Sequence, residues 1–310
     1  MIRVEDLVKR YRSAKQNAVD GITFDVGAGE FFALLGPNGA GKTTTISILT
    51  TTLAPTSGRA FIDGHDIVAD ASTVRRSVGI IFQKASLDLN LTGEENVRLH
   101  AVLYGLYAYA PSYRLMSDAY RRQLQELAAL VGLEREIRAP VRTLSGGMRR
   151  KLEIVRSLMH RPKVLFLDEP TAGLDPPSRR TLWEHLTTVR REAATTIFLT
   201  THYLEEAEQA DRILVIDHGR VVAQGSPASL KADLAREWLV IDADDRAGLR
   251  AELAALAIRF SGDGPFQVVA AGAAVHPVLR SIATPLTTVR IHAPSLEDAY
   301  LDIVSRTADE

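Results

Sequence analysis

Residues 36–44 read Gly36-Pro37-Asn38-Gly39-Ala40-Gly41-Lys42-Thr43-Thr44, which matches the phosphate-binding pattern G-x-x-x-x-G-K-[ST]. The apolar run 31–35 precedes this stretch and a helical pattern at 44–53 follows it, so a buried strand, a loop and a helix come in the required order. Glycines allow the positive φ angles that turn successive backbone N–H groups toward phosphate oxygens. The pattern predicts a nucleoside triphosphate site in which Lys42 reaches the β- and γ-phosphates and Thr43 binds Mg²⁺.

The composition limits the classes of protein to which this chain can belong. With 310 residues, 46% of them hydrophobic, it can bury the core of a large α/β domain with a smaller one, or of two ordinary domains. A net charge of −1 argues against a nucleic-acid or anionic-membrane partner held by overall charge, although a local basic patch stays open. The absence of cysteine excludes disulfides, cysteine-bound zinc and a thiol nucleophile, which suits a cytosolic protein. Neither a signal peptide nor a run of roughly 18 apolar residues is present, so we expect any work at a membrane to depend on a partner already there.

Short apolar runs alternate with longer helical patterns through residues 1–230. The runs lack the alternation of polar and apolar residues, which predicts strands buried on both faces of a mostly parallel sheet and therefore an α/β core. The strand pattern is missing from about 86–161, where helical patterns predict an inserted helical subdomain. In its last helix a basic run, 149–151, is most simply interpreted as a solvated face. The apolar runs lie at 78–82, 164–167, 196–199 and 213–216, and the inserted helices at 94–106, 113–131 and 145–160.

The chain changes character after a turn at Gly225-Ser226-Pro227. Strand patterns at 238–241, 266–269 and 287–291, separated by two helical ones, predict a small C-terminal α/β domain at 231–310. Ser295 and Asp298 have the spacing of a capping box at the start of a last amphipathic helix.

Two carboxylates follow the apolar run at 164–167. Asp168 and Glu169 end a predicted buried strand, which suits Asp168 to hold Mg²⁺ through water and Glu169 to polarise an attacking water. An exposed Asp-Glu turn is the alternative, but the upstream Lys42 makes a shared phosphate site the better interpretation.

A Ser-Gly-Gly sequence begins the last helix of the insertion, in the stretch Leu144-Ser145-Gly146-Gly147-Met148. The Ser145 hydroxyl and the unobstructed amides of Gly146 and Gly147 suit binding of an anion at a helix N-terminus. Taken alone this is an ordinary N-cap, yet it lies just over twenty residues before Asp168.

Together these motifs resemble the ATP-binding cassette (ABC) ATPases, whose signature is LSGGQ and whose motifs come in the same order. Met148 stands where the family has Gln, which leaves the phosphate-facing Ser145 and glycines intact. The resemblance covers residues 1–230. It implies a P-loop NTPase (RecA-like) core with an antiparallel β subdomain and a helical signature subdomain, followed by the small C-terminal domain.

The resemblance also gives roles to single residues. Gln83 matches the glutamine that in the ABC ATPases senses Mg²⁺ and the attacking water. His202 matches the family's switch histidine, which contacts the γ-phosphate. Asp175, in the stretch 173–175, matches the D-loop between paired subunits, although it can equally cap a helix. Tyr11 matches the aromatic that stacks on adenine, with an ordinary surface tyrosine as the alternative. The expected catalytic residues are Glu169, His202 and Gln83; the expected Mg²⁺ site is Thr43, Gln83 and Asp168; the expected nucleotide contacts are Tyr11, residues 36–44, Ser145, Gly146, Gly147 and Asp175.

The family resemblance implies a second nucleotide-binding subunit, expected to be another copy of this chain. Two such domains pair head to tail, with each ATP between Lys42 of one and Ser145 of the other. Glu169 is the expected base, and ATP binding and hydrolysis close and open the pair.

Residues 294–301, together with 144–151, look like the daunorubicin-resistance type of exporter ATPase. This implies a transporter ATPase at the cytoplasmic face of the membrane, driving export of drugs, lipids or polyketides through a separate permease and conferring antibiotic resistance. The groove along 87–95 and the following helix is the expected permease contact. A soluble ABC ATPase that is not coupled to transport, or a different ABC transporter class, is the alternative. No nucleic-acid partner is expected.

Overall fold

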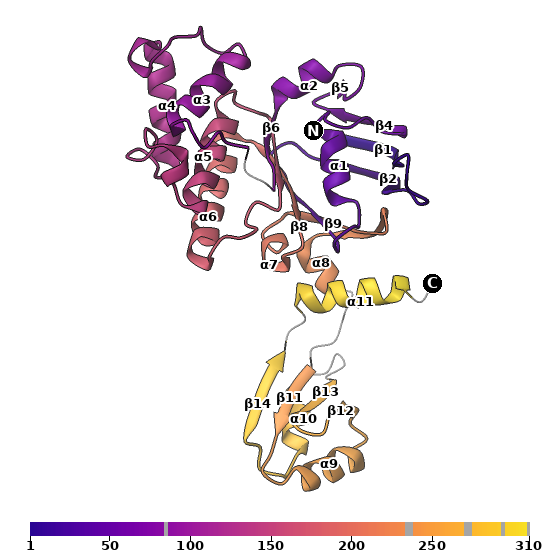
Figure 1. Ribbon diagram of the computed structural model, residues 1–310. Helices are drawn as coiled ribbons and strands as arrows, with labels where there is room; N and C mark the ends of the chain where they lie inside the picture. Colours follow the sequence, from indigo (N-terminus) through magenta and orange to yellow (C-terminus); the bar gives the residue numbers. More distant parts are fainter. Residues whose placement is uncertain (84–85, 233–237, 270–274, 293–294, 309–310) are drawn as a thin grey trace. The chain divides into compact units, whose positions relative to one another are not determined.

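The computed structural model describes residues 1–83, 86–232, 238–269, 275–292 and 295–308, and it divides into two units. The first unit is Met1–Gln224 and the second is Gly225–Glu310, so the division falls slightly before the sequence-based boundary at 230. Figure 1 labels the elements of both. Each unit is described by itself.

A six-stranded sheet forms the centre of the first unit, with strand order β10-β9-β3-β8-β7-β6. The strands from β6 to β9 in this order run parallel, and every residue of β3, β7 and β8 is buried. Burial on both faces explains why these segments lack polar alternation. The prediction of a parallel α/β core is confirmed. The bounds are Phe31–Leu35 for β3, Val78–Ile81 for β6, Val164–Asp168 for β7, Thr196–Thr201 for β8, Arg212–Asp217 for β9 and Arg220–Gly225 for β10.

A second, antiparallel sheet has the order β2-β1-β4-β5. Its strands are β1 (Ile2–Lys9), β2 (Val19–Val26), β4 (Ser57–Ile62) and β5 (His65–Asp66). Strand β2 alternates buried and exposed residues, as expected for a sheet with one face on the core. Phe24 of β2 stacks on Phe32 of β3 at 5.5 Å, and helix α1 (Lys42–Leu49) shares this core with both sheets. Helix α2 (Ala71–Ser77) leads into β6.

Helices gather on the other side of the central sheet, where Figure 1 shows α3, α4, α5 and α6 opposite the antiparallel sheet. The described part of 86–161 contains helices and no assigned strand, as the sequence indicated. One predicted helix, at 113–131, is divided, because Ser117 caps a new helix by accepting a hydrogen bond from the Tyr120 N–H. The bounds are Gly93–Leu103 for α3, Tyr113–Leu115 for η1, Asp118–Leu130 for α4, Val141–Thr143 for η2, Gly146–Leu158 for α5, Pro176–Ala193 for α6 and Leu204–Ala207 for α7.

The second unit pairs a small sheet with helices. Its strand order is β12-β13-β11-β14, and all three pairings are antiparallel. Leu239, Ile241 and Phe266 from the sheet and Leu249 and Leu253 from α9 fill its core. At the start of α11 the Ser295 N–H donates to Asp298 and the Asp298 N–H donates back to the Ser295 hydroxyl, so the predicted capping box is confirmed. The bounds are Pro227–Ala232 for α8, Trp238–Asp242 for β11, Arg246–Ala255 for α9, Phe260–Ser261 for β12, Phe266–Val269 for β13, Val275–Ser281 for α10, Thr288–His292 for β14 and Leu296–Ala308 for α11.

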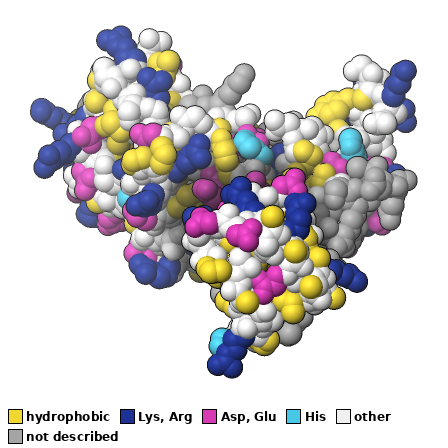
Figure 2. All heavy atoms as spheres, turned by 90° about the horizontal axis from the view of Figure 1, so that it is seen from below, with side chains coloured by type: hydrophobic (Ala, Val, Ile, Leu, Met, Phe, Trp, Pro, Cys, Tyr) yellow, Lys and Arg dark blue, Asp and Glu magenta, His cyan; other side chains and the backbone are white. Residues whose placement is uncertain are grey.

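The surface carries both signs of charge. On the face drawn in Figure 2, Lys and Arg side chains are interspersed with Asp and Glu, in keeping with the net charge of −1.

Candidate functional site

The phosphate-loop pattern forms the connection between β3 and α1. A Cβ atom at Gly36 would lie 2.3 Å from the Ile216 carbonyl oxygen, and one at Gly41 would lie 2.4 Å from the Ala18 oxygen. Gly41 also has a φ of 107°, and it is the N-cap residue of α1. Because backbone presses on the loop at both positions, only glycine fits there. Asn38 and Gly39 are exposed at the tip of the loop.

Lys42 is a buried cation beneath this loop, with 5% of its surface exposed. Its Nζ donates to the carbonyl oxygens of Gly36 (2.8 Å) and Pro37 (3.0 Å) and lies 3.9 Å from Glu169 Oε1. Burial lowers the pKa of Lys42, and the charges of Glu169 and Asp168 oppose that shift. A buried ammonium group beside exposed loop amides favours an anionic ligand.

Asp168 ends strand β7 next to the first turn of α1. Its Oδ1 accepts hydrogen bonds from the Thr200 hydroxyl at 2.6 Å and the Thr43 hydroxyl at 3.4 Å. Burial raises the pKa of Asp168, while the Thr200 hydrogen bond opposes the rise. A hydroxyl and a carboxylate are the hard oxygen donors that Mg²⁺ takes from proteins in small number, so these residues fit a magnesium ion.

Glu169 connects the ends of three neighbouring strands. Its Oε2 accepts a hydrogen bond from Gln83 Nε2 at 2.8 Å, and His202 Nδ1 lies 3.1 Å from its Oε1. Gln83 follows β6, Glu169 follows β7 and His202 follows β8, and parallel strands place these ends at one edge of the sheet. The structure therefore brings Gln83, Glu169 and His202 together with Lys42. A carboxylate held in this way is suited to accept a proton from a nearby water.

Tyr11 lies just past the end of β1, beside the phosphate loop. Its hydroxyl is 3.3 Å from the Thr44 Oγ1, and 43% of its surface is exposed. An exposed ring at this place leaves a face on which a base can stack.

The Ser-Gly-Gly sequence lies apart from the phosphate loop. Ser145 caps α5 by accepting a hydrogen bond from the Met148 N–H at 3.2 Å. A Cβ atom at Gly147 would meet the Ser178 Oγ at 3.0 Å, and the Ser178 N–H donates to Asp175, which caps α6. Within the described ranges no hydrogen bond joins Ser145–Gly147 to residues 36–44. Ser145, Gly146 and Gly147 therefore lie beside Asp175 at the start of α5, whereas Lys42 begins α1, and Figure 1 shows these two helices on opposite sides of the central sheet.

Arg150 corrects one interpretation of the sequence. The run 149–151 was expected to be a solvated basic face, yet Arg150 is only 6% exposed. Its guanidinium donates to the carbonyl oxygens of Phe82, Gln83 and Pro170 and to the carboxylate of Glu153. The only local signal was Glu153 three residues later, because the carbonyl partners are distant in sequence.

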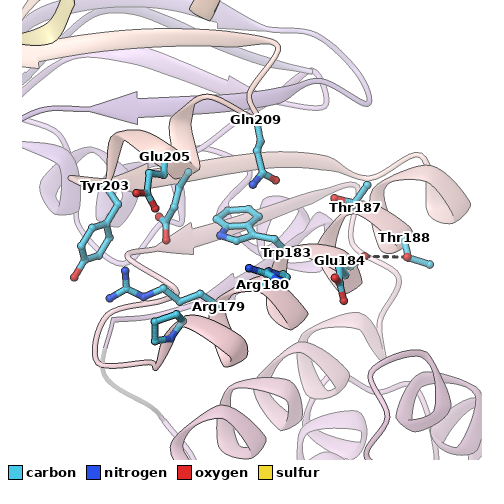
Figure 3. Close-up of a pocket in the computed structure, with 11 residues that line it drawn as sticks. Arg179, Arg180, Trp183, Glu184, Thr187, Thr188, Tyr203, Glu205 and Gln209 are labelled. Carbon is cyan, nitrogen blue, oxygen red and sulfur yellow. Dashed lines mark hydrogen bonds between the residues drawn. The ribbon is translucent and has the colours of Figure 1, made fainter. Parts of the chain in front are cut away.

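A hollow of about 910 Å³ lies between α6 and α7, and Figure 3 shows Arg179 reaching toward Tyr203 at its edge. The Arg179 guanidinium lies 4.5 Å from the Tyr203 ring centre, and its Nε donates to the Leu174 oxygen. Buried Glu206 accepts hydrogen bonds from Thr171 and Thr201, and burial raises its pKa. These residues support the segments that carry Asp175 and His202, and no sequence motif pointed to them.

Comparisons with known proteins agree with this geometry. The ABC transporter family model matches residues 19–172. The daunorubicin/doxorubicin resistance ATP-binding protein DrrA of Streptomyces peucetius is 44% identical over 250 residues, which are 79% of this chain and 72% of DrrA. The chain belongs to the ABC transporter ATP-binding family. As an ABC ATPase it couples ATP hydrolysis to transport, and its resemblance to the daunorubicin-resistance type is confirmed.

A second relative spans nearly all of this ABC ATPase, and a solved structure shares its fold. Nod factor export ATP-binding protein I of Burkholderia pseudomallei (strain K96243) is 38% identical over 311 residues, covering 98% of this chain and 97% of the relative. The dimeric structure of the ATP-binding cassette MJ0796, in a post-hydrolysis state with ADP and Pi, has a TM-score of 0.65 and 26% identity, covering 73% of this chain and 98% of that one. The predicted P-loop NTPase fold is confirmed. Among the described residues no helix combines the length and apolar character needed to cross a bilayer.

Proposed function

We propose that this ABC ATPase is the motor subunit of an exporter of drugs, lipids or similar hydrophobic compounds. It works with a separate membrane permease at the cytoplasmic face of the membrane. The observation that carries the ATPase part is the hydrogen-bonded group of Glu169, Gln83 and His202 beside Lys42. The export part rests on relatives that are named for drug resistance and for Nod factor export.

The residues divide the work as follows. The amides of 36–44 and Lys42 bind the phosphates, and Tyr11 stacks on the base. Glu169 accepts a proton from water, while Gln83 and His202 hold its carboxylate in one orientation. Thr43 and Asp168, with Gln83 nearby, would hold Mg²⁺, which when bound supplies positive charge to the phosphates.

The site is completed by a second copy of the chain. Ser145, Gly146, Gly147 and Asp175 lie together and away from the phosphate loop of their own chain. Head-to-tail pairing presents them to the phosphates bound at the partner's Lys42. The dimeric solved cassette supports this arrangement.

Glu169→Gln tests the proposed chemistry. Gln keeps the size of the side chain and loses the basic oxygen, so we expect ATP turnover with the permease to fall by about 10²- to 10⁴-fold. ATP binding, measured with a fluorescent analogue, stays within about twofold. Glu184→Gln, on the exposed face of α6, is the matched control and keeps normal turnover. Unchanged turnover in Glu169→Gln would remove Glu169 as the base.

The same variant separates export from uncoupled ATPase activity. Inverted vesicles are prepared with this chain and a co-expressed six-helix permease, and uptake of a fluorescent hydrophobic drug is recorded. We expect uptake that requires ATP and is lost in Glu169→Gln. ATPase activity that is indifferent to the permease, with no uptake, would favour the soluble ATPase instead.

A further inference from the structure

Arg150 joins two backbone segments of the site to helix α5 through one guanidinium group. Its Nε donates to the Pro170 oxygen at 2.8 Å, its Nη1 to the Phe82 oxygen at 2.6 Å, and its Nη2 to the Gln83 oxygen at 3.0 Å. The planar fork of arginine points several donors in fixed directions, and the flexible ammonium group of lysine does not reproduce this.

The three carbonyl groups flank the residues proposed to act on water. Phe82 and Gln83 directly follow the end of β6, and Pro170 directly follows Glu169. The side chains of Gln83 and Glu169 meet at 2.8 Å. Arg150 therefore sets the spacing of the two backbones whose side chains form that hydrogen bond.

Glu153 holds Arg150 and the same segment from one turn further along α5. It is fully buried; its Oε2 accepts from Arg150 Nη1 at 2.7 Å and its Oε1 from the Ser86 N–H at 2.9 Å. Arg156 adds hydrogen bonds to the Ser86 carbonyl and hydroxyl oxygens. The chain is thus fixed to α5 at both Gln83 and Ser86. With Arg150 these residues form a continuous polar network of Arg150, Glu153, Arg156 and Ser86, in which Arg150 and Glu153 are buried, Arg156 is partly buried and Ser86 is exposed.

Helix α5 begins at the Ser-Gly-Gly sequence, and Arg150 lies one turn after it. A shift of α5 against the central sheet would move the Arg150 fork relative to Phe82, Gln83 and Pro170. We infer that Arg150 is a positioning residue that makes the Gln83–Glu169 geometry depend on the position of α5. The inference rests on the catalytic roles proposed for Gln83 and Glu169.

The test separates positioning from simple structural support. Arg150→Lys keeps the charge and loses the fork, so kcat for ATP falls by about 10- to 100-fold, as small misplacements of reacting groups do. KM and the binding of a fluorescent ATP analogue stay within about twofold. Arg149→Lys is the matched control, because the hydrogen bonds that Arg149 makes among the described residues go to the carbonyl oxygens of Val141 and Arg142 and not to those of Phe82, Gln83 or Pro170.

A double-mutant cycle gives the decisive readout. If Arg150 acts through the hydrogen bond between Gln83 and Glu169, adding Arg150→Lys to Gln83→Ala, which lacks that bond, lowers kcat by less than about twofold more. The pair Arg150→Gln with Glu153→Gln removes both buried charges together and repeats the cycle should the lysine variant fold poorly. The inference would be overturned if the losses of kcat in the two single variants multiplied in the double variant, or if folded Arg150 variants kept a normal kcat. Normal turnover in Glu169→Gln would instead refute the proposed chemistry, so the two failures are distinguishable.

Discussion

Two consecutive carboxylates at the end of β7 serve different partners because their backbones differ. Asp168 is the last strand residue, and its side chain turns to Thr43 and Thr200. Glu169 has a φ of 46°, in the left-handed region that non-glycine residues rarely adopt, and its side chain turns to Gln83 and His202. Such conformations cluster at functional sites, where the surroundings hold them. One residue of unusual backbone thus separates the proposed Mg²⁺ ligand from the proposed base.

Glu252, in the second unit, provides a prediction of pH dependence. Its carboxylate accepts hydrogen bonds from the Thr284 hydroxyl (2.6 Å), the Ala283 N–H (2.5 Å) and the Thr284 N–H (3.0 Å). These hydrogen bonds hold the pKa of Glu252 below its ordinary value of 4.5, and the bond from the Thr284 hydroxyl has the largest effect. Because the pKa is lower in the folded state, the ionised carboxylate stabilises the fold at pH values above its ordinary pKa. This stabilisation is lost as the pH falls through the pKa of the folded state.

Glu252→Gln therefore weakens the protection of the segment before β14 against hydrogen exchange at neutral pH. The difference between the variant and the original chain becomes progressively smaller below pH 4.5. Hydrogen exchange of peptides covering 275–292, corrected for intrinsic rates, measures this in the full chain. Peptides from β3 and β8 serve as internal controls. An equal difference between the two proteins at neutral and acid pH would contradict the assignment.

At the scale of elements, the sequence predicted the segments that need only local information. Strands β3, β7 and β8 are buried on both faces, so their continuous apolar runs identified them. For Gln83 and His202 the sequence offered only the family resemblance, and the structure shows that they meet Glu169 because all three follow the ends of neighbouring parallel strands. The role of Arg150 did not follow, because its carbonyl partners are 20, 67 and 68 residues away and any residue type supplies a carbonyl. The sequence also did not predict the antiparallel pairing of the strands in the second unit. A pattern of apolar residues indicates which residues are buried, but it does not indicate which strands are neighbours.

Helix α3 gives a prediction at this scale, because a complete capping box begins it. The Thr92 hydroxyl accepts from the Glu95 N–H, and the Glu95 carboxylate accepts from the Thr92 N–H and hydroxyl. Removing an N-cap leaves helix N–H groups unsatisfied, so Thr92→Ala lowers the free energy of unfolding by about 1 kcal/mol. Urea unfolding followed by circular dichroism measures the loss.

Thr187→Ala is the control for Thr92→Ala. Thr187 is exposed within α6, so its replacement changes the free energy of unfolding by about 0.5 kcal/mol or less. Equal stabilities of the Thr92 variant and the control would show that the capping box does not stabilise the chain.

At the scale of the whole molecule, the first unit holds the residues of the proposed site in two separate places. The phosphate loop lies at the carboxyl edge of the central sheet with Glu169, while Ser145, Gly146 and Gly147 lie with Asp175 at the starts of α5 and α6. In the proposed head-to-tail pair, two chains would therefore make two composite sites, each with one half from each chain. The two halves can be damaged separately by substitutions, so mixing two variants tests whether the sites are shared between chains.

Lys42→Ala damages the phosphate loop, and Gly146→Asp damages the other half. A Cβ atom at Gly146 has its nearest neighbour, Leu174, at 3.9 Å, so the chain accommodates aspartate there. An acidic residue in the first turn of a helix is also favourable for the helix itself. The new carboxylate would nevertheless repel a phosphate presented to the start of α5.

Both variants are made in a Glu169→Gln background to retain ATP, and they carry different tags. Each alone builds only damaged sites, so neither pairs with Mg-ATP. Mixed together they form a heterodimer with one intact site and one doubly damaged site, and we expect ATP-dependent co-purification of the two tags. With both changes in one chain and none in the other, every site of the heterodimer is damaged, and co-purification is lost. Equal co-purification in the two arrangements would show that the sites are not shared between chains.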